Sequence, residues 1–324
     1  MYDIITIGEI LVEVLSEHVG QRFSSPGILL GPYPSGSPAI FIDQAARMGA
    51  KTAIVAKVGC DDFAALNLNR LRRDGVDVSH IIETNQNSTG VAFVTYFEDG
   101  SRQFIFHFTK AACGELSPAD VSEELVRNSK YLHIMGCSIT GSPSMGEAIM
   151  QAVRLSKECG TKISFDPNIR LELLNGKIMD YYKEIMDACD VLLTGKSELA
   201  LLFGEREKAI RELLEQKDRI VVVKDGSRGT SVYTRENAFT VATYPADEKD
   251  PTGAGDCFDA TFLSSVLGGL SLEEAAARAN AAGAKAVEKR GPMEGNTTQE
   301  ELAAFMGSCP TPAAVRIDNP YNDR

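Results

Sequence analysis

Buried strand patterns alternate with helical patterns along most of this chain, and no other feature constrains the fold as strongly. Short runs of consecutive apolar residues predict buried strands, and apolar residues spaced three or four apart predict the helices between them. The predicted strands are 4–7, 52–58, 131–135, 162–165, 191–193 and 219–223. Strands that alternate with helices form a parallel sheet covered by helices on both faces, so the expected class is α/β.

One segment departs from this alternation and predicts a second, smaller sheet. Residues 89–110 show period-two alternation on both sides of a polar turn at 98–101, which indicates a β-hairpin. One face of the hairpin carries three aromatic side chains, Phe104, Phe106 and Phe108. The opposite face carries His107, because neighbouring side chains of a strand point in opposite directions.

Three other segments have their own character. Residues 16–38 are rich in Gly, Pro and Ser and are too long for a simple loop, so they predict a functional segment or a small flap. A second hairpin, expected to be exposed, is predicted over 230–242. Residues 307–324 contain Pro, Asn and Asp without periodicity, and they predict a loosely held tail.

Composition and charge exclude several classes of function. The 324 residues carry a net charge of −12, which would repel nucleic acids and anionic membranes. The sequence has neither a basic leader with an apolar core nor a run of 18 apolar residues. Seven cysteines, an odd number without a C-x-x-C pair, argue against a disulfide framework or zinc cluster and favour a reducing cytoplasm.

The stretch Asp250–Asp256, with the sequence DPTGAGD, predicts a site for an anion. Its two glycines permit a tight turn, and the pattern of Phe258, Phe262 and Val266 predicts a helix directly after it. The start of a helix presents unpaired N–H groups at the positive end of its dipole, where phosphate binds readily. Asp256 would repel that phosphate unless it takes a proton from an attacking hydroxyl; the alternative is a carboxylate that only caps the helix.

Residues that follow the predicted strands form a second group of candidates. They are Gly8, Gly59, Gly136, Asp166, Thr194, Lys224 and Asp250. Ligands of parallel sheets bind at the carboxyl ends of the strands, so these residues should lie along one edge. Asp166, Asn168 and Arg170 would suit sugar hydroxyls or a phosphate, although an Asx-turn would explain the first two.

Some polar residues have two interpretations. His107 and Lys110 stand at the end of the hairpin, where they either close over a ligand or form a solvated edge. His133 lies within a strand and is expected in the core. Gly195-Lys196-Ser197 suggests a phosphate-binding P-loop, but Asp190 stands where that motif requires glycine, so we reject it.

With these residues in view, the sequence resembles the PfkB (ribokinase-like) family of carbohydrate kinases, from about residue 4 to residue 306. The stretch 250–256 is similar to the D-x-T-G-A-G-D motif of that family. Four other segments fit in the correct order: 59–63, 166–170, 280–284 and 290–292. The resemblance leans toward the fructokinase, 2-keto-3-deoxygluconate kinase and tagatose kinase group.

The resemblance implies a three-layer α/β/α kinase domain over 1–306, with a mostly parallel central sheet. It implies a small β lid from about 10–35 and 89–110, with 307–324 as the tail. It further implies a homodimer in the cytoplasm that uses ATP and Mg²⁺, allows a monovalent cation, and phosphorylates a hydroxyl of a small sugar, a ketose or a keto-sugar acid.

The resemblance also assigns roles to residues of this chain. Asp256 would accept the proton of the sugar hydroxyl, while the amides of Gly253, Ala254 and Gly255 hold the charge that develops on the phosphoryl group. The expected nucleotide-binding residues are Lys224, Gly226, Thr252, Asn280 and Gly283. The expected sugar-binding residues are Glu13, Gly36, Ser37, His107, Lys110, Asp166, Asn168 and Arg170. Glu198 would act on Mg²⁺ through water.

Departures from the family pattern leave the substrate open. Gly195 replaces the Asn of the N-x-x-E motif, Ile40 replaces a sugar-binding Asn, and Glu13 stands where an Asp is usual. These changes keep two alternatives in play. One is a sugar- or nucleotide-sensing protein that has lost catalysis on the same fold. The other is a nucleoside or vitamin kinase in which the three phenylalanines of the hairpin hold a ring.

Overall fold

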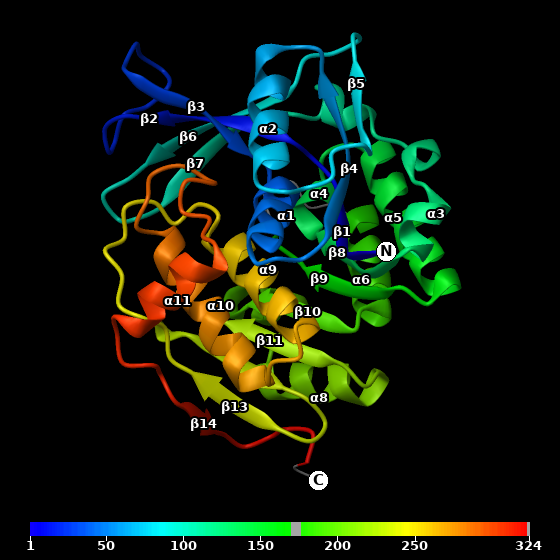
Figure 1. The fold of residues 1–324 in the computed structure, drawn as a ribbon, viewed down its shortest axis with the longest axis vertical. Helices are drawn as coiled ribbons and strands as arrows, with labels where there is room; N and C mark the ends of the chain where they lie inside the picture. The colour runs from blue at the N-terminus through cyan, green and yellow to red at the C-terminus, as the bar shows by residue number, and fades with distance from the viewer. Residues whose placement is uncertain (170–175, 323–324) are drawn as a thin grey trace.

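A computed structural model describes residues 1–169 and 176–322 of the chain (Figure 1). The strands are β1 (Tyr2–Ile7), β2 (Leu11–Ser16), β3 (Leu29–Ser35), β4 (Thr52–Gly59), β5 (Ile81–Thr84), β6 (Gly90–Tyr96), β7 (Arg102–His107), β8 (Ser129–Met135), β9 (Lys162–Asp166), β10 (Val191–Gly195), β11 (Ile220–Lys224), β12 (Thr230–Tyr233), β13 (Ala238–Val241) and β14 (Ala314–Arg316). The α-helices are α1 (Ser37–Arg47), α2 (Asp62–Arg73), α3 (Glu123–Arg127), α4 (Gly136–Ile139), α5 (Pro143–Cys159), α6 (Gly176–Ala188), α7 (Lys196–Phe203), α8 (Arg206–Gln216), α9 (Ala254–Leu267), α10 (Leu272–Ala286) and α11 (Gln299–Gly307).

The central sheet has ten strands in the order β14-β13-β12-β11-β10-β9-β8-β1-β4-β5. From β11 to β5 neighbouring strands run parallel, whereas β12, β13 and β14 add antiparallel pairs at one side. The mostly parallel sheet expected from the alternation of strands and helices is therefore confirmed. Its carboxyl edge is where ligands of such sheets bind.

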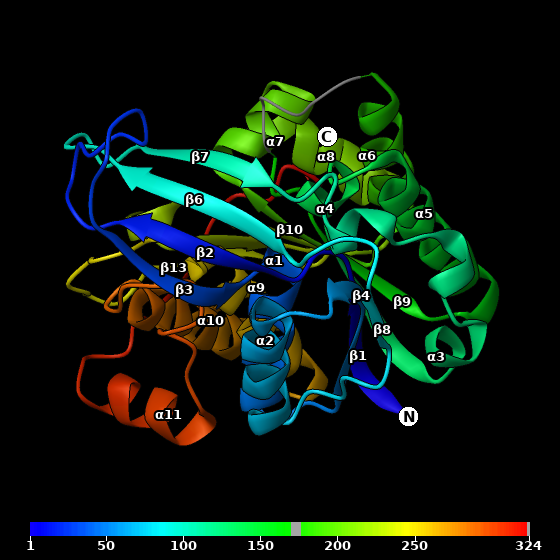
Figure 2. The ribbon, with the colours of Figure 1, turned by 90° about the horizontal axis from the view of Figure 1, so that it is seen from above.

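Helices cover both faces of this sheet and complete three layers (Figure 2). Alternation within β1 shows the division, because Ile5 and Ile7 pack into one apolar cluster and Ile4 packs into another. The first cluster includes residues of α5, α6 and α8, and the second includes residues of α1, α2, α9 and α10. Each face of the sheet thus has its own core, as expected for a sheet buried on both sides.

A second sheet of four strands projects from this body in the order β3-β2-β6-β7 (Figures 1 and 2). We call it the lid. Its outer pairs are antiparallel and its central pair, β2 with β6, is parallel. Both expected parts of the lid, from about 10–35 and 89–110, contribute to it. The lid stands over the carboxyl edge of the central sheet because β2 begins four residues after β1 ends.

Two expectations about the C-terminal half are wrong. The hairpin over 230–242 is not exposed: β12 is buried, and β12 and β13 belong to the central sheet. The tail is not loose throughout, since Ala314–Arg316 pairs with β13 as an antiparallel edge strand. Three residues without apolar periodicity gain their order from backbone hydrogen bonds to a neighbouring strand, which no local pattern reveals.

Candidate active site

The turn before α9, which we call the anion turn (residues 250–255), forms the wall between two cavities. Pro251 and Gly255 line both of them. Gly253 is the cap of α9 and has φ = 82°, a left-handed conformation that favours glycine. A Cβ atom at Gly253 would lie 2.3 Å from the carbonyl oxygen of Pro292. The anion turn therefore requires glycine both for its φ angle and for its close approach to the neighbouring loop.

The first cavity has a volume of about 240 Å³ and lies between the lid and the carboxyl edge of the central sheet. Predicted residues that line it include Glu13, Gly36, Ser37, Asp166, Asn168, Glu198, Gly253, Gly255 and Asp256. Ile40, one of the departures from the family pattern, also lines it. The structure thus brings together residues from widely separated parts of the chain, and we call this space the sugar-side cavity.

Asp256 is the third residue of α9, and only 7% of its surface is exposed. It is not the capping residue, because Gly253 occupies that position. The carboxylate lines the sugar-side cavity next to amides that a helix start leaves without intrahelical partners. This placement favours a chemical task for Asp256 over the capping alternative.

Two buried glutamates line the sugar-side cavity, Glu9 just before the lid and Glu13 within lid strand β2. Glu13 accepts a hydrogen bond from the Ser35 hydroxyl at 2.7 Å, and Glu9 accepts one from the Ser138 hydroxyl at 2.5 Å. Glu9 was not among the predicted site residues. It follows Gly8 at the carboxyl end of β1, so the rule that placed Asp166 at a strand end could have found it.

Asp166 and Asn168 form the Asx-turn that the sequence suggested, with the Asn168 amide 3.0 Å from Asp166 Oδ1. Asn168 has φ = 39°, a conformation that Asn tolerates better than most residues. Its side-chain amide donates to the Ser37 hydroxyl at 3.2 Å and also lines the cavity. The Asx-turn therefore does not prevent Asp166 and Asn168 from lining the cavity. Arg170, the third predicted member of this group, lies outside the described residues.

His107 and Lys110 are not among the described residues that line the sugar-side cavity. Both are exposed, and the His107 ring packs edge-on against Phe93 of the lid. The opposite face of β7 lines the cavity instead, through Arg102, Phe104 and Phe106, with Phe108 beyond the strand. His107 therefore does not face the cavity in this structure, because the face of β7 with Phe104 and Phe106 packs inward and the face with Ile105 and His107 meets solvent.

Two side chains join the lid to the anion turn. The Tyr96 hydroxyl donates to Asp250 at 2.9 Å, and the Arg102 guanidinium donates to the Thr252 hydroxyl at 2.9 Å. Burial and the charge of Asp250 raise the pKa of Tyr96, so it remains a hydroxyl donor. Thr252 lines the sugar-side cavity and not the second cavity, which differs from its predicted role with the nucleotide.

The second cavity has a volume of about 280 Å³ and lies on the other side of the anion turn. The predicted residues Gly226, Asn280 and Gly283 line it, together with Ala254 and Gly255 of α9. Its wall is mainly apolar, with Phe258, Tyr244 and Val287 among its residues. An apolar slot that ends at a helix start suits a flat ring joined to phosphates. We call it the nucleotide-side cavity.

Lys224 lines both cavities, but its ammonium group is already fully bonded. It donates to Asp166 Oδ2 at 3.0 Å and to the two carboxylate oxygens of Asp259 at 2.9 and 3.0 Å. A lysine ammonium has three hydrogens, and three acceptors use them all. Lys224, predicted to bind the nucleotide, therefore lines the nucleotide-side cavity with an ammonium group that is already engaged.

Glu198 lies at the start of α7, where its carboxylate accepts the amides of Gly195 and Ile169, each at 2.7 Å. Burial, reinforced by the charge of Asp166, raises the pKa of Glu198. No cage of three or more metal-binding side chains occurs in the described part of the chain. Magnesium needs only one or two carboxylates besides water and phosphate oxygens, so Asp166 and Glu198 fit such an ion held through water.

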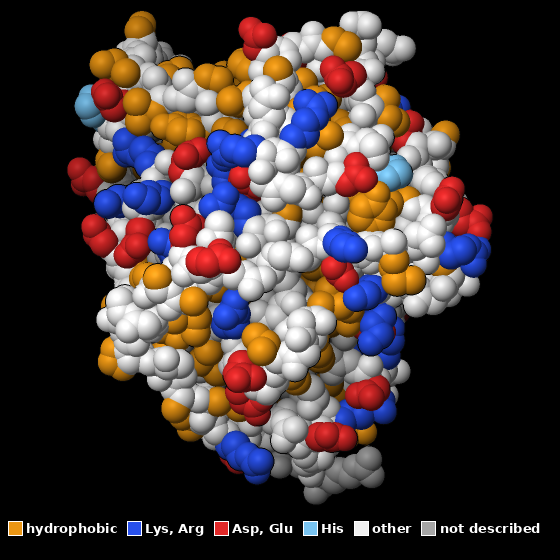
Figure 3. Space-filling model, viewed as in Figure 1, with side chains coloured by type: hydrophobic (Ala, Val, Ile, Leu, Met, Phe, Trp, Pro, Cys, Tyr) orange, Lys and Arg blue, Asp and Glu red, His pale blue; other side chains and the backbone are white. Residues whose placement is uncertain are grey.

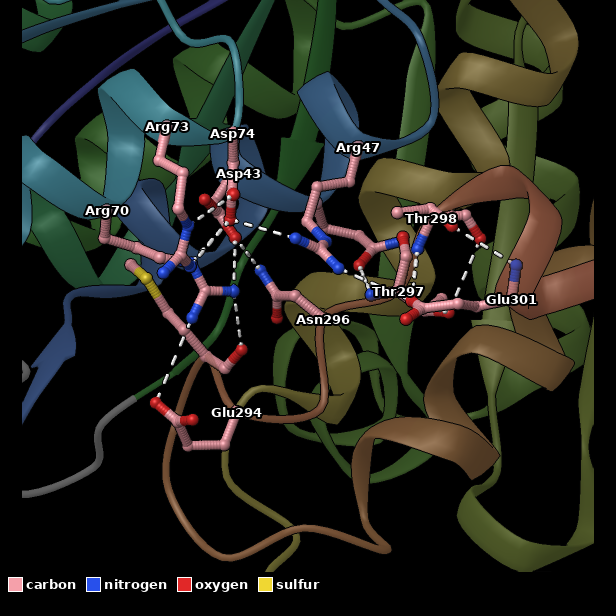
Figure 4. Close-up of polar contacts among 12 residues, drawn as sticks. Asp43, Arg47, Arg70, Arg73, Asp74, Glu294, Asn296, Thr297, Thr298 and Glu301 are labelled. Carbon is pink, nitrogen blue, oxygen red and sulfur yellow. Dashed lines mark hydrogen bonds and ion pairs between the residues drawn. The ribbon is translucent and has the colours of Figure 1, made fainter.

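A polar network supports the loop at 291–298 behind the anion turn (Figure 4). Arg70 of α2 donates to the Met293 carbonyl at 2.9 Å and to Asp43 at 3.1 Å. Asn296 donates to the same Asp43 carboxylate at 2.6 Å. This loop supplies the Pro292 carbonyl that touches Gly253. The network therefore fixes the surface against which the anion turn is built.

Comparisons with known proteins agree with this geometry. Residues 31–299 match the model of the pfkB family carbohydrate kinases. Fructokinase-2 of Solanum lycopersicum is 30% identical, over 94% of this chain and 95% of its own length. A 5-dehydro-2-deoxygluconokinase of Clostridium perfringens is 27% identical, over 94% of this chain and 93% of its own length.

The solved structures point the same way. An E. coli protein assigned provisionally as a ribokinase II, solved in complex with ATP and Mg²⁺, is 42% identical with a TM-score of 0.91. The match covers 95% of this chain and 100% of that protein. The chain therefore belongs to the pfkB family of carbohydrate kinases, and it is a phosphotransferase that acts on a sugar hydroxyl.

Proposed function

We propose that this pfkB-family kinase transfers the γ-phosphoryl group of ATP to a primary hydroxyl of a six-carbon ketose or keto-sugar acid. The observation that carries the proposal is the anion turn, which separates two cavities and presents Asp256 to one of them. A fructokinase and a 5-dehydro-2-deoxygluconokinase among the relatives support a substrate of this size. Tagatose, fructose and 2-keto-3-deoxygluconate are the candidates we would test first.

In the proposed reaction the sugar hydroxyl approaches Asp256 from the sugar-side cavity. The carboxylate accepts its proton as the oxygen attacks the γ-phosphorus, which raises the rate roughly 10²- to 10⁴-fold. The amides of Gly253, Ala254 and Gly255 stabilise the charge on the transferred group, and each such donor contributes about 3 kcal/mol. The ADP leaving group remains on the nucleotide side of the anion turn.

Magnesium would neutralise charge on the ATP phosphates when bound, and Asp166 and Glu198 would hold it through water. The two residues line the sugar-side cavity beneath the anion turn. Burial favours a raised pKa for Asp166, but the Lys224 ammonium and hydrogen bonds outweigh it and lower that pKa, so Asp166 remains an anion. The proposed reaction also allows a monovalent cation, as the resemblance does.

Sugar recognition would combine hydrogen bonds with an apolar surface. Glu9, Glu13 and Asn168 offer polar atoms to the cavity, while Phe104 and Phe106 of the lid offer aromatic rings. The two rings stack with centroids 5.2 Å apart. Hydroxyls on one edge and C–H groups on one face are the features of a sugar that such a cavity would bind.

Closure of the lid is a further part of the proposal, because phosphoryl transfer requires that water be kept from ATP. The contacts of Tyr96 and Arg102 with the anion turn would hold the lid in a closed position. Comparison of sugar-free and sugar-bound crystals tests this motion. An identical lid position in both would contradict it.

A homodimer is also proposed. Hydrophobic side chains gather on the surface of the lid (Figure 3). Val19, Ile28, Leu29 and Ile105, which lie in or between the lid strands, are exposed, which suits a surface that a second copy covers. Light scattering measures the mass of the protein in solution.

No helix among the described residues is long and apolar enough to cross a membrane. All seven cysteines are free thiols, which favours the reducing cytoplasm.

The aromatic face of the lid also favours one alternative, a kinase for a nucleoside or vitamin alcohol whose ring stacks on Phe104 and Phe106. The sensing protein without catalysis is the other alternative. A coupled assay with ATP and Mg²⁺ against ketoses, keto-sugar acids and nucleosides separates all three. Turnover of nucleosides alone would select the first alternative, and binding without turnover would select the second.

The test of mechanism is Asp256→Asn. We expect kcat to fall 10²- to 10⁴-fold while the KM for ATP changes little, because the variant keeps the anion turn but cannot accept the proton. Asp62→Asn is the matched control, since Asp62 lies in the first turn of α2, is exposed and lines neither cavity. A folded Asp256→Asn enzyme with wild-type turnover would refute the role of Asp256.

A further inference from the structure

A buried carboxylate that the proposed reaction does not use lies directly behind the anion turn. Asp259 is three residues after Asp256 on α9, and none of its surface is exposed. It lines neither the sugar-side nor the nucleotide-side cavity among the described residues. A carboxylate without access to water needs compensating charge or hydrogen bonds. The Asp259 carboxylate therefore needs a specific partner at this position.

The partner is the ammonium group of Lys224, at the carboxyl end of β11. Both oxygens of Asp259 accept from it, and Asp166 at the carboxyl end of β9 accepts its third hydrogen. The ammonium also lies 5.9 Å from the ring centroid of Phe258, a residue of α9. We call Asp166, Lys224 and Asp259 the Lys224 cluster, which joins two strands of the sheet to α9.

The groups of the Lys224 cluster stabilise one another's charges. Burial raises the pKa of Asp259 well above its usual value, and the Lys224 ammonium opposes that shift. The Lys224 ammonium and a side-chain hydrogen bond with Asp259 lower the pKa of Asp166. Burial opposes the charge of Lys224, but Asp166 and Asp259 outweigh it and raise its pKa, so the ammonium stays charged.

The cluster lies next to the reacting groups. The Lys224 ammonium is 3.9 Å from the position that a Cβ atom would take on Gly255 of the anion turn. Asp166 and Lys224 line the sugar-side cavity, and Lys224 lines the nucleotide-side cavity as well. Movement of the ammonium would therefore change the position of α9 relative to the ends of β9 and β11, which line the two cavities.

We propose that Asp259 is a positioning residue for phosphoryl transfer. With Asp166 it fixes the Lys224 ammonium beneath the first turn of α9, and this holds the anion turn and Asp256 in place between the two cavities. The inference rests on the proposed kinase function. A positioning role differs from that of an ion pair that only stabilises the fold. When Asp259 is replaced, kcat should fall more than the affinity for either substrate.

The decisive variant is Asp259→Leu, which keeps the branched shape and the number of heavy atoms of the side chain but has no hydrogen-bonding group. We expect kcat to fall at least about 30-fold while the KM values for sugar and ATP change less than about threefold, because a small misplacement of reacting groups acts mainly on turnover. Asp259→Asn can still accept from Lys224 and donate to Asp166, so it should recover most of the turnover. Asp259→Ser serves if the leucine variant does not fold.

Lys57→Met supplies the matched control. Lys57 of β4 forms a similarly shielded ion pair with Asp120, at 2.8 Å, and lines neither cavity. We expect it to lose thermal stability without losing kcat. If Asp259→Leu behaves in the same way as Lys57→Met, the positioning role is overturned. Equal loss of turnover in Asp259→Asn and Asp259→Leu would overturn it too.

A crystal structure of Asp259→Leu tests the geometry without any assay of turnover. The anion turn and Asp256 should shift relative to β9 and β11, and an unmoved turn would overturn the inference. This crystal structure separates the proposed kinase function from the proposed role of Asp259. If the wild-type protein phosphorylates no sugar, the proposed function fails, whereas the position of the anion turn in the variant still decides the role of Asp259.

Discussion

Replacing Gly253 by alanine should damage the reaction more than the fold. The residue has φ = 82°, and a non-glycine residue in that region costs roughly 1–2 kcal/mol. The new Cβ atom would stand 2.3 Å from the Pro292 carbonyl oxygen, whereas real Cβ contacts are essentially never shorter than 3.0 Å. The turn and the loop at 291–298 must therefore separate by at least about 0.7 Å, which follows from those two distances.

The loop resists that separation, so the anion turn moves instead. The Gly291 amide donates to Asp250 at 3.0 Å, and the Arg70 and Asn296 contacts hold the rest of the loop to α1 and α2 (Figure 4). Overpacking of this kind costs about 1–3 kcal/mol, so the total loss in the free energy of unfolding should be about 2–5 kcal/mol. Displaced amides should lower kcat about 10²-fold, the effect of losing one such donor.

Gly160→Ala is the control that measures only the cost of a non-glycine residue at a positive φ angle. Gly160 ends α5 with φ = 75°, and no atom lies within 4 Å of its would-be Cβ. We expect a loss of about 1–2 kcal/mol in the free energy of unfolding and no change in kcat. Urea unfolding and a coupled ADP-release assay give both quantities for both variants. A Gly253→Ala enzyme that keeps wild-type kcat would show that the amides of the anion turn do not act in the reaction.

Three further perturbations test other parts of the structure. Burial lowers the pKa of His133 to about 3, compared with its ordinary value of 6.5. Below pH 6.5 the unfolded chain therefore binds a proton at His133 that the folded protein does not. Stability should then fall by about 1.4 kcal/mol per pH unit from pH 6.5 downward, and His133→Gln, measured by urea unfolding, should lack that slope. Gly283→Val should raise the KM for ATP and not for sugar, since a Cβ at Gly283 is already 3.4 Å from the Ala254 carbonyl; an unchanged KM would place ATP elsewhere. Glu198→Gln should raise the Mg²⁺ concentration for half-maximal turnover, and an unchanged Mg²⁺ titration would exclude its role.

The fold was predictable because its main signals are local. Apolar runs place the strands of the central sheet, and the alternation around residues 98–101 predicts the lid hairpin. The anion turn is equally local, since Gly253 and Asp256 are three residues apart in one stretch. Edge strand β14 had no such signal, because its three exposed residues depend on the hydrogen bonds of β13.

The site was less predictable because its contacts join distant segments. Period-two alternation shows that His107 and Phe106 lie on opposite faces of a strand, but not which face the cavity meets. Lys224 stood at a strand end as expected, yet its partners Asp166 and Asp259 are 58 and 35 residues away. The resemblance led us to expect that Lys224 binds the nucleotide. Only the packing of α9 on the sheet shows that its hydrogens are already used.

The same long-range contacts make the lid and the anion turn one mechanical unit. Asp250 accepts from Tyr96 of the lid, from the Gly291 amide of the supporting loop and from the Thr252 amide within the turn itself. A sugar that packs against the aromatic face of the lid therefore acts on the element that anchors the turn. Binding energy from the parts of the sugar that do not react can then be used to orient the groups that do. Asp250 lies at the centre of these contacts. In keeping with this anchoring role, it is fully buried and lines neither cavity.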